Sequence, residues 1–148
     1  MSSTALSASE PMGYVLADRF YAVSAAMQQV TGKMLQELGL TEALADALWQ
    51  LDPAHGPQPR RSLADRLHCD PSNVTFLVDR LEERGLVERV SDPQDRRIKA
   101  IGLTEQGVSV RETLVRATAL NPIFARLTAS EQQQLADLLD RCVESPIR

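Results

Sequence analysis

The sequence has little of what extracellular or membrane proteins depend on. Its two cysteines, Cys69 and Cys142, form no CxxC pair, which predicts free thiols in a reducing compartment. No apolar run approaches the roughly 18 residues that a membrane span needs, and the N-terminus lacks the basic and apolar blocks of a signal peptide. We therefore expect a cytoplasmic protein that makes no contact with a membrane.

The chain also lacks the motifs that most enzymes require. It has no glycine-rich phosphate loop, no cluster of metal ligands and no pairing of a nucleophile with a base. His68, Cys69 and Asp70 are adjacent, but three neighbours on one turn rarely converge on a single ion. We predict that the protein is not an enzyme and binds no metal or cofactor.

Charge is unevenly distributed along the chain. The net charge of −4 at pH 7 by itself argues against a partner rich in phosphate. Residues 60–100 nevertheless hold nine of the 16 Lys and Arg and eight of the 20 Asp and Glu, so their net charge is +1 and that of the remainder is −5. Five cations fall within sixteen residues: Arg84, Arg89, Arg96, Arg97 and Lys99. Any affinity for DNA must come from geometry, symmetry and a few placed cations.

The length of 148 residues and the 43% hydrophobic content predict one domain over residues 1–148. Apolar residues at helical spacing predict a long helix from Tyr14 to Leu38, ended by Gly39, and a second helix opened by Thr41. The proline-rich stretch 52–61 predicts an exposed loop. Ser62 then opens a short helix in an arrangement that resembles a capping box.

A fourth helix follows the third after a tight turn. Asp70 is its predicted N-cap, Pro71 occupies its first turn, and Gly85 ends it. Its apolar residues fit the i, i+3, i+4, i+7 pattern of an inward face: Val74, Leu77, Val78 and Leu81. The outward face then consists of Ser72, Asn73, Thr75, Phe76, Asp79, Arg80 and Glu83.

Two short strands, Val87–Ser91 and Arg97–Leu103, are predicted around a polar turn at 92–96. Thr104 caps a fifth helix that reaches about Leu120, and Thr128 with Glu131 forms a capping box for a last helix. The fold class is therefore mainly α with a small β-hairpin wing. Two short helices joined by a turn and followed by a charged hairpin make a winged helix-turn-helix.

Each part of this motif suits DNA. The second helix of the pair fits the major groove, where its N-terminal residues meet base edges. Ser72, Asn73 and Thr75 are short hydrogen-bonding residues for bases or phosphates, and Arg80 lies one turn further along the same face. Phe76 offers only apolar contact there, for example with a thymine methyl, or packs inward.

The charged tip of the hairpin suits the minor groove. Arg96 and Arg97 can reach its narrow A·T stretches, and Asp95 is placed to hold one of them. An alternative interpretation is that Asp95 and Arg97 form a surface ion pair of little consequence.

The segment SLADRLHCDPSNVTFLVDRLEERGLVERVSDPQDRRIKAIGLTEQG, residues 62–107, resembles the core of the MarR (multiple antibiotic resistance regulator) family. The resemblance implies a homodimeric repressor whose helices at 12–38 and 105–145 dimerise, while residues 41–103 form a DNA-binding lobe on a palindromic operator. It implies release by a small amphipathic ligand and a minor-groove contact by Arg97, since Asp95 and Arg97 match the Asp-x-Arg wing pattern. Many members carry a basic residue where Phe76 stands.

Several alternatives remain open from the sequence. Cys69, in the turn before the fourth helix, could act as a thiol switch if its pKa were lowered and its sulfur exposed. Cys142 suits a small apolar filler in a dimer helix. Phe20, Tyr21 and Trp49 are candidates for a ligand pocket, although aromatics at helical spacing are more often core. A winged helix can also serve as a protein-interaction module, which would predict a monomer indifferent to DNA.

Overall fold

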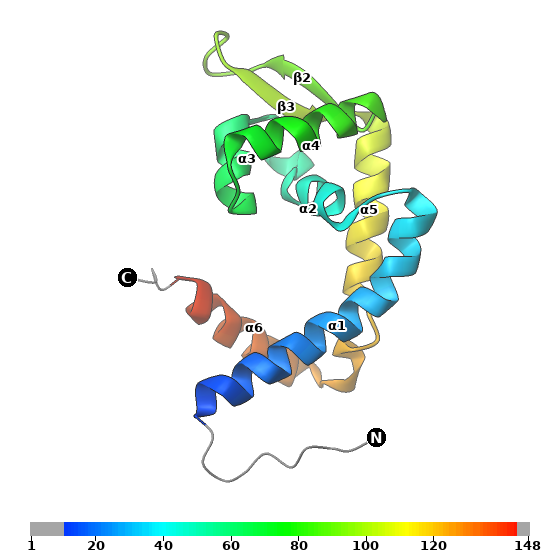
Figure 1. The fold of residues 1–148 in the computed structure, drawn as a ribbon, viewed down its shortest axis with the longest axis vertical. Coiled ribbons are helices and arrows are strands. Elements are labelled where there is room, and N and C mark those ends of the chain that lie inside the picture. The colour runs from blue at the N-terminus through cyan, green and yellow to red at the C-terminus, as the bar shows by residue number, and fades with distance from the viewer. Residues whose placement is uncertain (1–10, 145–148) are drawn as a thin grey trace. The chain divides into compact units, whose positions relative to one another are not determined.

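In the computed structural model, residues 11–144 can be described (Figure 1). The chain divides into two compact units: one runs from Gly32 to Ala119, and the other combines the segments before and after it. The described helices are α1 (Met12–Leu38), α2 (Glu42–Gln50), α3 (Arg60–Leu67), α4 (Pro71–Glu83), α5 (Glu105–Ala119) and α6 (Ala129–Glu144). Two 3-10 helices, η1 (Pro53–His55) and η2 (Phe124–Arg126), and three strands, β1 (Gln58–Pro59), β2 (Val87–Ser91) and β3 (Lys99–Leu103), accompany them.

The central unit, residues 32–119, has a continuous apolar core. Leu48 of α2, Leu63 of α3 and Leu81 of α4 are completely buried, and the core extends to Leu114 of α5. The predicted inward face of α4 is confirmed, since Val74, Leu77, Val78 and Leu81 are its buried residues. Burying such a side chain contributes about 1.5–3 kcal/mol, so this core is the main source of the unit's stability.

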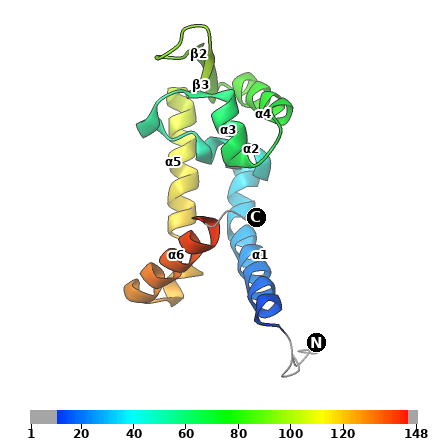
Figure 2. The same cartoon turned by 90° about the vertical axis from the view of Figure 1, so that its left-hand side faces the viewer.

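The sheet of this unit has three antiparallel strands in the order β1-β3-β2. The predicted hairpin is confirmed, with Val87 opposite Leu103 and Ser91 opposite Lys99. Strand β3 begins at Lys99, two residues later than predicted, because Arg97 and Ile98 belong to the turn. The turn between β2 and β3 projects beyond the helices of the unit (Figures 1 and 2).

The prediction of an exposed loop over 52–61 was wrong for most of its length. Residues 53–55 form η1, and Gln58 and Pro59 form β1, which pairs with Ile101 and Ala100 of β3. Gln58 is buried, with 6% of its surface exposed. Its amide oxygen accepts a hydrogen bond from Arg66 at 2.9 Å, and its amide nitrogen donates to the Gln50 carbonyl at 3.3 Å. These bonds satisfy a polar side chain that composition alone would place in solvent.

The predicted start of the third helix was also wrong. Helix α3 begins at Arg60, so Ser62 lies inside it and caps nothing, and the N-cap is Pro59, which contributes no side-chain hydrogen bond. The extended conformation of Pro59, with φ −60° and ψ 147°, brings the chain from β1 directly into the helix. A proline is compatible with this position because its missing N–H is not needed there.

Other predicted helix ends are confirmed. The Thr41 hydroxyl accepts from the Leu44 N–H at 3.3 Å, and the Thr104 hydroxyl accepts from the Gly107 N–H at 3.0 Å. Gly39 and Gly85 adopt φ of +63° and +69°, as residues after a helix end often do. Gly107 is required for a different reason: a Cβ there would lie 1.8 Å from the Leu86 carbonyl oxygen.

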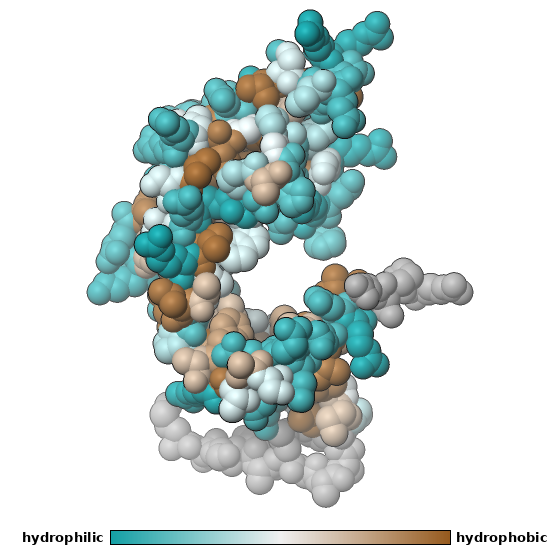
Figure 3. All heavy atoms as spheres, turned by 180° about the vertical axis from the view of Figure 1, so that it is seen from behind, coloured by the Kyte–Doolittle hydropathy of each residue, from teal (hydrophilic) through white to brown (hydrophobic). Residues whose placement is uncertain are grey.

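The second unit contains the first part of α1, together with η2 and α6. The predicted capping box is confirmed: Thr128 N–H donates to Glu131 at 2.8 Å and Glu131 N–H donates to the Thr128 hydroxyl at 3.3 Å. No described residue of α1 or α6 is buried. Large apolar side chains are therefore exposed on both helices, among them Phe20, Tyr21, Leu138 and Leu139, and apolar residues appear at the surface in Figure 3.

Candidate nucleic-acid interface

Helices α3 and α4 pack together and are joined by a three-residue turn at 68–70. His68 adopts the left-handed conformation, with φ 51° and ψ 42°, and the N–H of Cys69 donates to the Ala64 carbonyl at 3.1 Å. Asp70 is the N-cap of α4 and Pro71 its first residue, as predicted, although the Asp70 side chain makes no capping hydrogen bond. The turn thus fixes α4 as the second helix of a helix-turn-helix.

The outward face of α4 begins with Ser72 and Asn73, which are both exposed. Phe76 is 56% exposed, so the alternative in which it packs inward was wrong. The Arg80 guanidinium lies 5.4 Å from the centre of the Phe76 ring, and Arg80 also pairs with Glu83 at 3.3 Å. This distance is within the range of a cation–π interaction, which favours the observed position of the Arg80 side chain. Both side chains face solvent.

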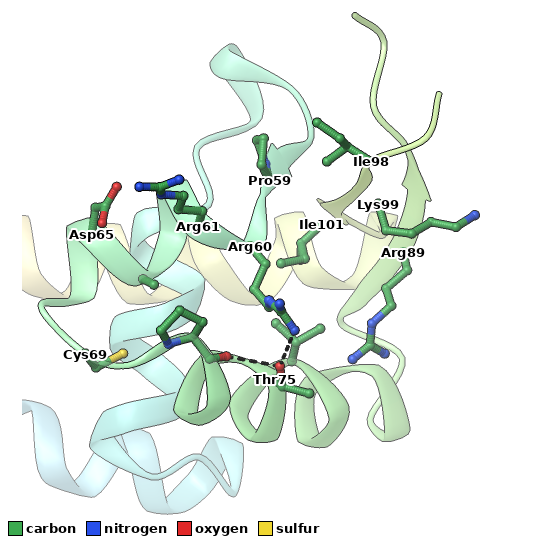
Figure 4. A pocket seen from close by; sticks show the side chains of 13 residues that line it. Pro59, Arg60, Arg61, Asp65, Cys69, Thr75, Arg89, Ile98, Lys99 and Ile101 are labelled. Carbon is green, nitrogen blue, oxygen red and sulfur yellow. Dashed lines mark hydrogen bonds between the residues drawn. The ribbon is translucent and has the colours of Figure 1, made fainter. Parts of the chain in front are cut away.

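Thr75 lies on the same face, and its hydroxyl makes two hydrogen bonds. Its hydroxyl donates to the Pro71 carbonyl at 3.0 Å and accepts from Nη1 of Arg60 at 3.0 Å (Figure 4). Arg60 belongs to α3 and lies in the segment that the sequence indicated to be a loop. Arg60, a cation that contacts the outward face of α4 through Thr75, was therefore not identified from the sequence. This outward face (Ser72, Asn73, Thr75, Phe76 and Arg80) is called the reading face below.

The turn at the tip of the wing is held by carboxylates. Asp92 directly follows β2 and is only 9% exposed. One of its carboxylate oxygens accepts hydrogen bonds from the N–H groups of Gln94 and Asp95 at 2.7 and 3.2 Å. Asp95 accepts the backbone N–H of Arg97 at 3.0 Å, so it holds the chain rather than the guanidinium. Within residues 11–144, the side chains of Arg96 and Arg97 make no hydrogen bond or ion pair and are exposed.

Several other arginines of this unit are committed to structural contacts. Three donate to carbonyls at helix ends: Arg84 to Leu38 at 2.7 Å and to Gly39, Arg66 to Gln50 at 3.1 Å, and Arg111 to Trp49 at 3.2 Å. A cation at a C-terminal helix end satisfies carbonyls that have no partner in the helix. These three arginines are therefore poor candidates for phosphate binding.

Arg89 connects the wing to α4. It extends from β2 and pairs with both Asp79 and Glu82 on the outer part of the helix. The hydrogen bond with Asp79, helped by the charge of Glu82 and opposed by partial burial, raises the pKa of Arg89. Its charge offsets the charges of these two carboxylates, and the two ion pairs link β2 to α4.

A cavity of about 940 Å³ lies between α3, α4 and the sheet (Figure 4). Apolar residues such as Val78, Ile98 and Ile101 line it together with cations such as Arg89 and Lys99. Cys69 also lines this cavity and is half-buried. Cys142, expected as an apolar filler, is exposed on α6 within this chain.

The three aromatic candidates for a ligand pocket are all exposed: Phe20 61%, Tyr21 76% and Trp49 41%. Phe20 and Tyr21 are on α1, Trp49 is on α2 in the central unit, and none of them lines the cavity of Figure 4. Their role in ligand binding stays a prediction.

Residues 11–144 contain neither a cluster of metal ligands nor a membrane-spanning helix. Among these residues, no group of three or more His, Cys, Asp or Glu side chains is arranged to hold a metal ion. None of the helices in that range combines the length and the apolar character needed to cross a membrane.

Two short helices joined by a turn, with an exposed face on the second, and a following hairpin with a cationic tip define a winged helix-turn-helix protein of the kind that regulates transcription. Residues 40–99 match the model of the MarR family. Over 136 residues the chain is 28% identical to the HTH-type transcriptional repressor MdtR of Bacillus subtilis, covering 88% of this chain and 87% of that protein. Residues 40–99 therefore carry the winged domain of the MarR family, and the chain is similar over most of its length to transcriptional regulators of that family.

Solved structures agree with this assignment. A transcriptional regulator of the MarR family from Rhodococcus sp. RHA1 superposes with a TM-score of 0.77 at 26% identity, covering 93% of this chain and 100% of that one. CouR from Rhodococcus jostii RHA1, bound to p-coumaroyl-CoA, gives a TM-score of 0.73 at 27% identity, with coverages of 97% and 99%. The winged fold expected from the sequence is thus confirmed.

Proposed function

We propose that the protein is a homodimeric transcriptional repressor that binds a palindromic operator through α4 and the wing. The observation that carries this proposal is the geometry of the central unit, in which the exposed face of α4 and the exposed cations Arg96 and Arg97 belong to one winged motif. Ser72, Asn73, Thr75, Phe76 and Arg80 form the proposed major-groove surface, and Asp95 positions the chain that carries Arg97. MdtR, a repressor by name, supports the direction of regulation.

The proposal of a homodimer rests on the second unit. The apolar residues Leu135, Leu138, Leu139 and Val143 recur along α6 at helical spacing and are 37–82% exposed. Exposed apolar stripes of this kind mark interaction surfaces. A two-fold copy of the same surface covers them, and it places two winged units on two half-sites about one helical turn of DNA apart.

We further propose that a small amphipathic ligand releases the DNA. CouR is bound to p-coumaroyl-CoA, and this chain has a cavity lined by apolar residues and by the cation Lys99. Such a lining suits a molecule with an apolar body and an anionic group. Because Thr75 also lines the cavity, an occupant would disturb the proposed reading face.

The test of DNA binding is a salt titration with the duplex that flanks the protein's own gene. We expect wild-type affinity to fall steeply as salt rises, because bound cations release counterions from the duplex. Arg97→Ala should weaken binding by about 10- to 100-fold, since a hydrogen bond to a charged group contributes about 1.5–3 kcal/mol.

Arg126→Ala is the matched control, because Arg126 is exposed on η2 and lies outside the winged unit. Equal affinity of the wild type and Arg97→Ala would remove the wing from the interface. A wild-type protein that binds no duplex at any salt concentration would contradict the proposed function as a whole.

A further inference from the structure

Arg60 differs from the other arginines that reach α4 because its partner is uncharged. Arg89 forms ion pairs with Asp79 and Glu82, and Arg80 forms one with Glu83. Arg60, from the first turn of α3, donates to the hydroxyl of Thr75 at 3.0 Å and forms no ion pair within residues 11–144. A hydroxyl partner leaves the positive charge of Arg60 uncompensated at the proposed reading face.

The hydrogen-bonding capacity of Thr75 is largely used. A threonine hydroxyl has one hydrogen to donate, and here it goes to the Pro71 carbonyl at 3.0 Å. One acceptor position is taken by Arg60. Thr75 therefore has no hydrogen left for an acceptor on a base or phosphate, whereas the guanidinium of Arg60 has five N–H donors and uses one of them here.

The position of Arg60 in its helix is unfavourable for stability. Arg60 and Arg61 are the first two residues of α3, no acidic residue lies in its first turn, and the N-cap Pro59 provides no side-chain hydrogen bond. The positive end of a helix dipole repels cations. A cation held where it opposes the local structure is a feature of functional sites, and the contact with Thr75 shows towards which surface it is held.

We propose that Arg60 binds a phosphate of the DNA backbone and that Thr75 is the positioning residue that directs its guanidinium. A phosphate is favoured over a base because α3 is the first helix of the motif, and that helix crosses the backbone when the second enters the groove. The guanidinium also matches phosphate oxygens in geometry and charge. This inference rests on the proposed function, since it assigns a further contact in the same DNA complex.

The experiment compares Arg60→Gln with Arg60→Lys on a duplex that the wild-type protein selects from a random-sequence pool. Gln keeps an amide N–H for Thr75 but removes the charge, whereas Lys keeps the charge. For Arg60→Gln we expect affinity to fall by about tenfold and the slope of log affinity against log salt to shrink by about 1. Arg60→Lys should retain the wild-type slope. The melting temperature of Arg60→Gln should not fall, because a cation is removed from the start of a helix.

Thr75 is tested by a second matched pair. Thr75→Ser keeps the hydroxyl that accepts from Arg60 and should retain more DNA affinity than Thr75→Val, which removes that acceptor and should weaken binding. In the Arg60→Gln background, Thr75→Val should have a smaller effect, because the arginine that it positions is gone. Equal effects of Thr75→Val in both backgrounds would contradict the positioning role.

The outcomes separate this inference from the function on which it rests. If the wild type selects no duplex, the proposed function fails. If the wild type binds and Arg60→Gln retains its full salt slope, the function stands and the Arg60 assignment is wrong. If Arg60→Gln instead changes the preference among single-base variants of the duplex, Arg60 reads a base and the phosphate assignment is overturned. A loss of melting temperature shared by the Gln and Lys variants would assign Arg60 a structural role only.

Discussion

The two units of this chain use apolar residues in opposite ways. In residues 32–119, α2, α3 and α4 each place two or more apolar residues in a common core, and Leu48, Leu63 and Leu81 are fully buried. In the other unit, α6 carries Leu135, Leu138, Leu139 and Val143 on helical spacing, and each of them is at least 37% exposed. The sequence patterns are similar, but among the described residues only the apolar side chains of the central unit are buried.

An amphipathic pattern therefore predicts that a helix face is buried, but not whether the covering surface belongs to the same chain or to another molecule. A helix obtains most of its stability from packing of its apolar face. The central unit meets this requirement internally, whereas none of the residues in 11–144 buries the apolar stripe of α6. The proposed function requires a second copy of the chain as the partner of α6. The effects of substitutions in α6 should therefore depend on protein concentration, whereas those of substitutions in the central core should not.

Leu81→Ala should have the largest effect on stability. Leu81 is 0% exposed in the core of the central unit, and truncation of such a leucine costs about 2–5 kcal/mol. Chemical denaturation should measure this loss as a change in the free energy of unfolding. Because the core is built within one chain, the loss should be the same in dilute and in concentrated protein. A loss that changes with protein concentration would show that a second chain contributes to the stability of this core.

Leu139→Ala should have a smaller effect of a different kind. Leu139 is 43% exposed within its own chain, and its burial in a dimer would contribute about 1.5–3 kcal/mol. We expect the variant to dissociate at a higher protein concentration than the wild type, as measured by analytical ultracentrifugation. An unchanged dissociation constant would show that this part of α6 is not an interface.

His68→Gly should raise stability slightly. His68 has φ 51°, a conformation that L residues adopt at a cost and that glycine adopts freely. The gain is partly offset by the greater entropy of glycine in the unfolded chain, so we expect a net increase of about 0.5 kcal/mol in the free energy of unfolding. DNA affinity should stay unchanged. A decrease in stability would mean that the His68 side chain contributes more than its backbone costs.

Glu131→Gln should have the smallest effect and a defined pH dependence. The N–H of Thr128, followed by its hydroxyl, donates to Glu131 and lowers the pKa of this carboxyl. A group with a lowered folded-state pKa contributes stability above its unfolded-state pKa of about 4.3 and loses it as pH falls through the folded-state value. Thermal melts should therefore differ most between wild type and variant near pH 6 and converge as the pH falls below 4. A difference that grows in acid would have the wrong sign.

The sequence predicted best where periodicity and capping agree. The bounds and inward face of α4 follow from Pro71, Gly85 and four spaced apolar residues, and each is confirmed. Strand β2 and the capping box of α6 were predicted for the same reason. Local signals were sufficient there because each element's own residues determine its ends.

The segment 52–61 could not be predicted in this way. Its prolines indicate a loop, yet β1 forms because β3 offers an open edge and because Arg66 and Gln50 satisfy the buried side chain of Gln58. The contact of Arg60 with Thr75 joins residues fifteen positions apart, so no local pattern encodes it. The candidate site was therefore found on α4 and the wing, while its contribution from α3 required the structure.

The most direct test of the central claim is the mass of the protein alone and on its selected duplex, measured in the same buffer by sedimentation. We expect the free protein to have twice the mass of the chain, and the complex to contain one duplex per two chains and to dissociate as salt rises. A free protein with the mass of one chain that ignores the duplex would contradict the assignment of DNA binding to the winged unit and of dimerisation to the exposed helices.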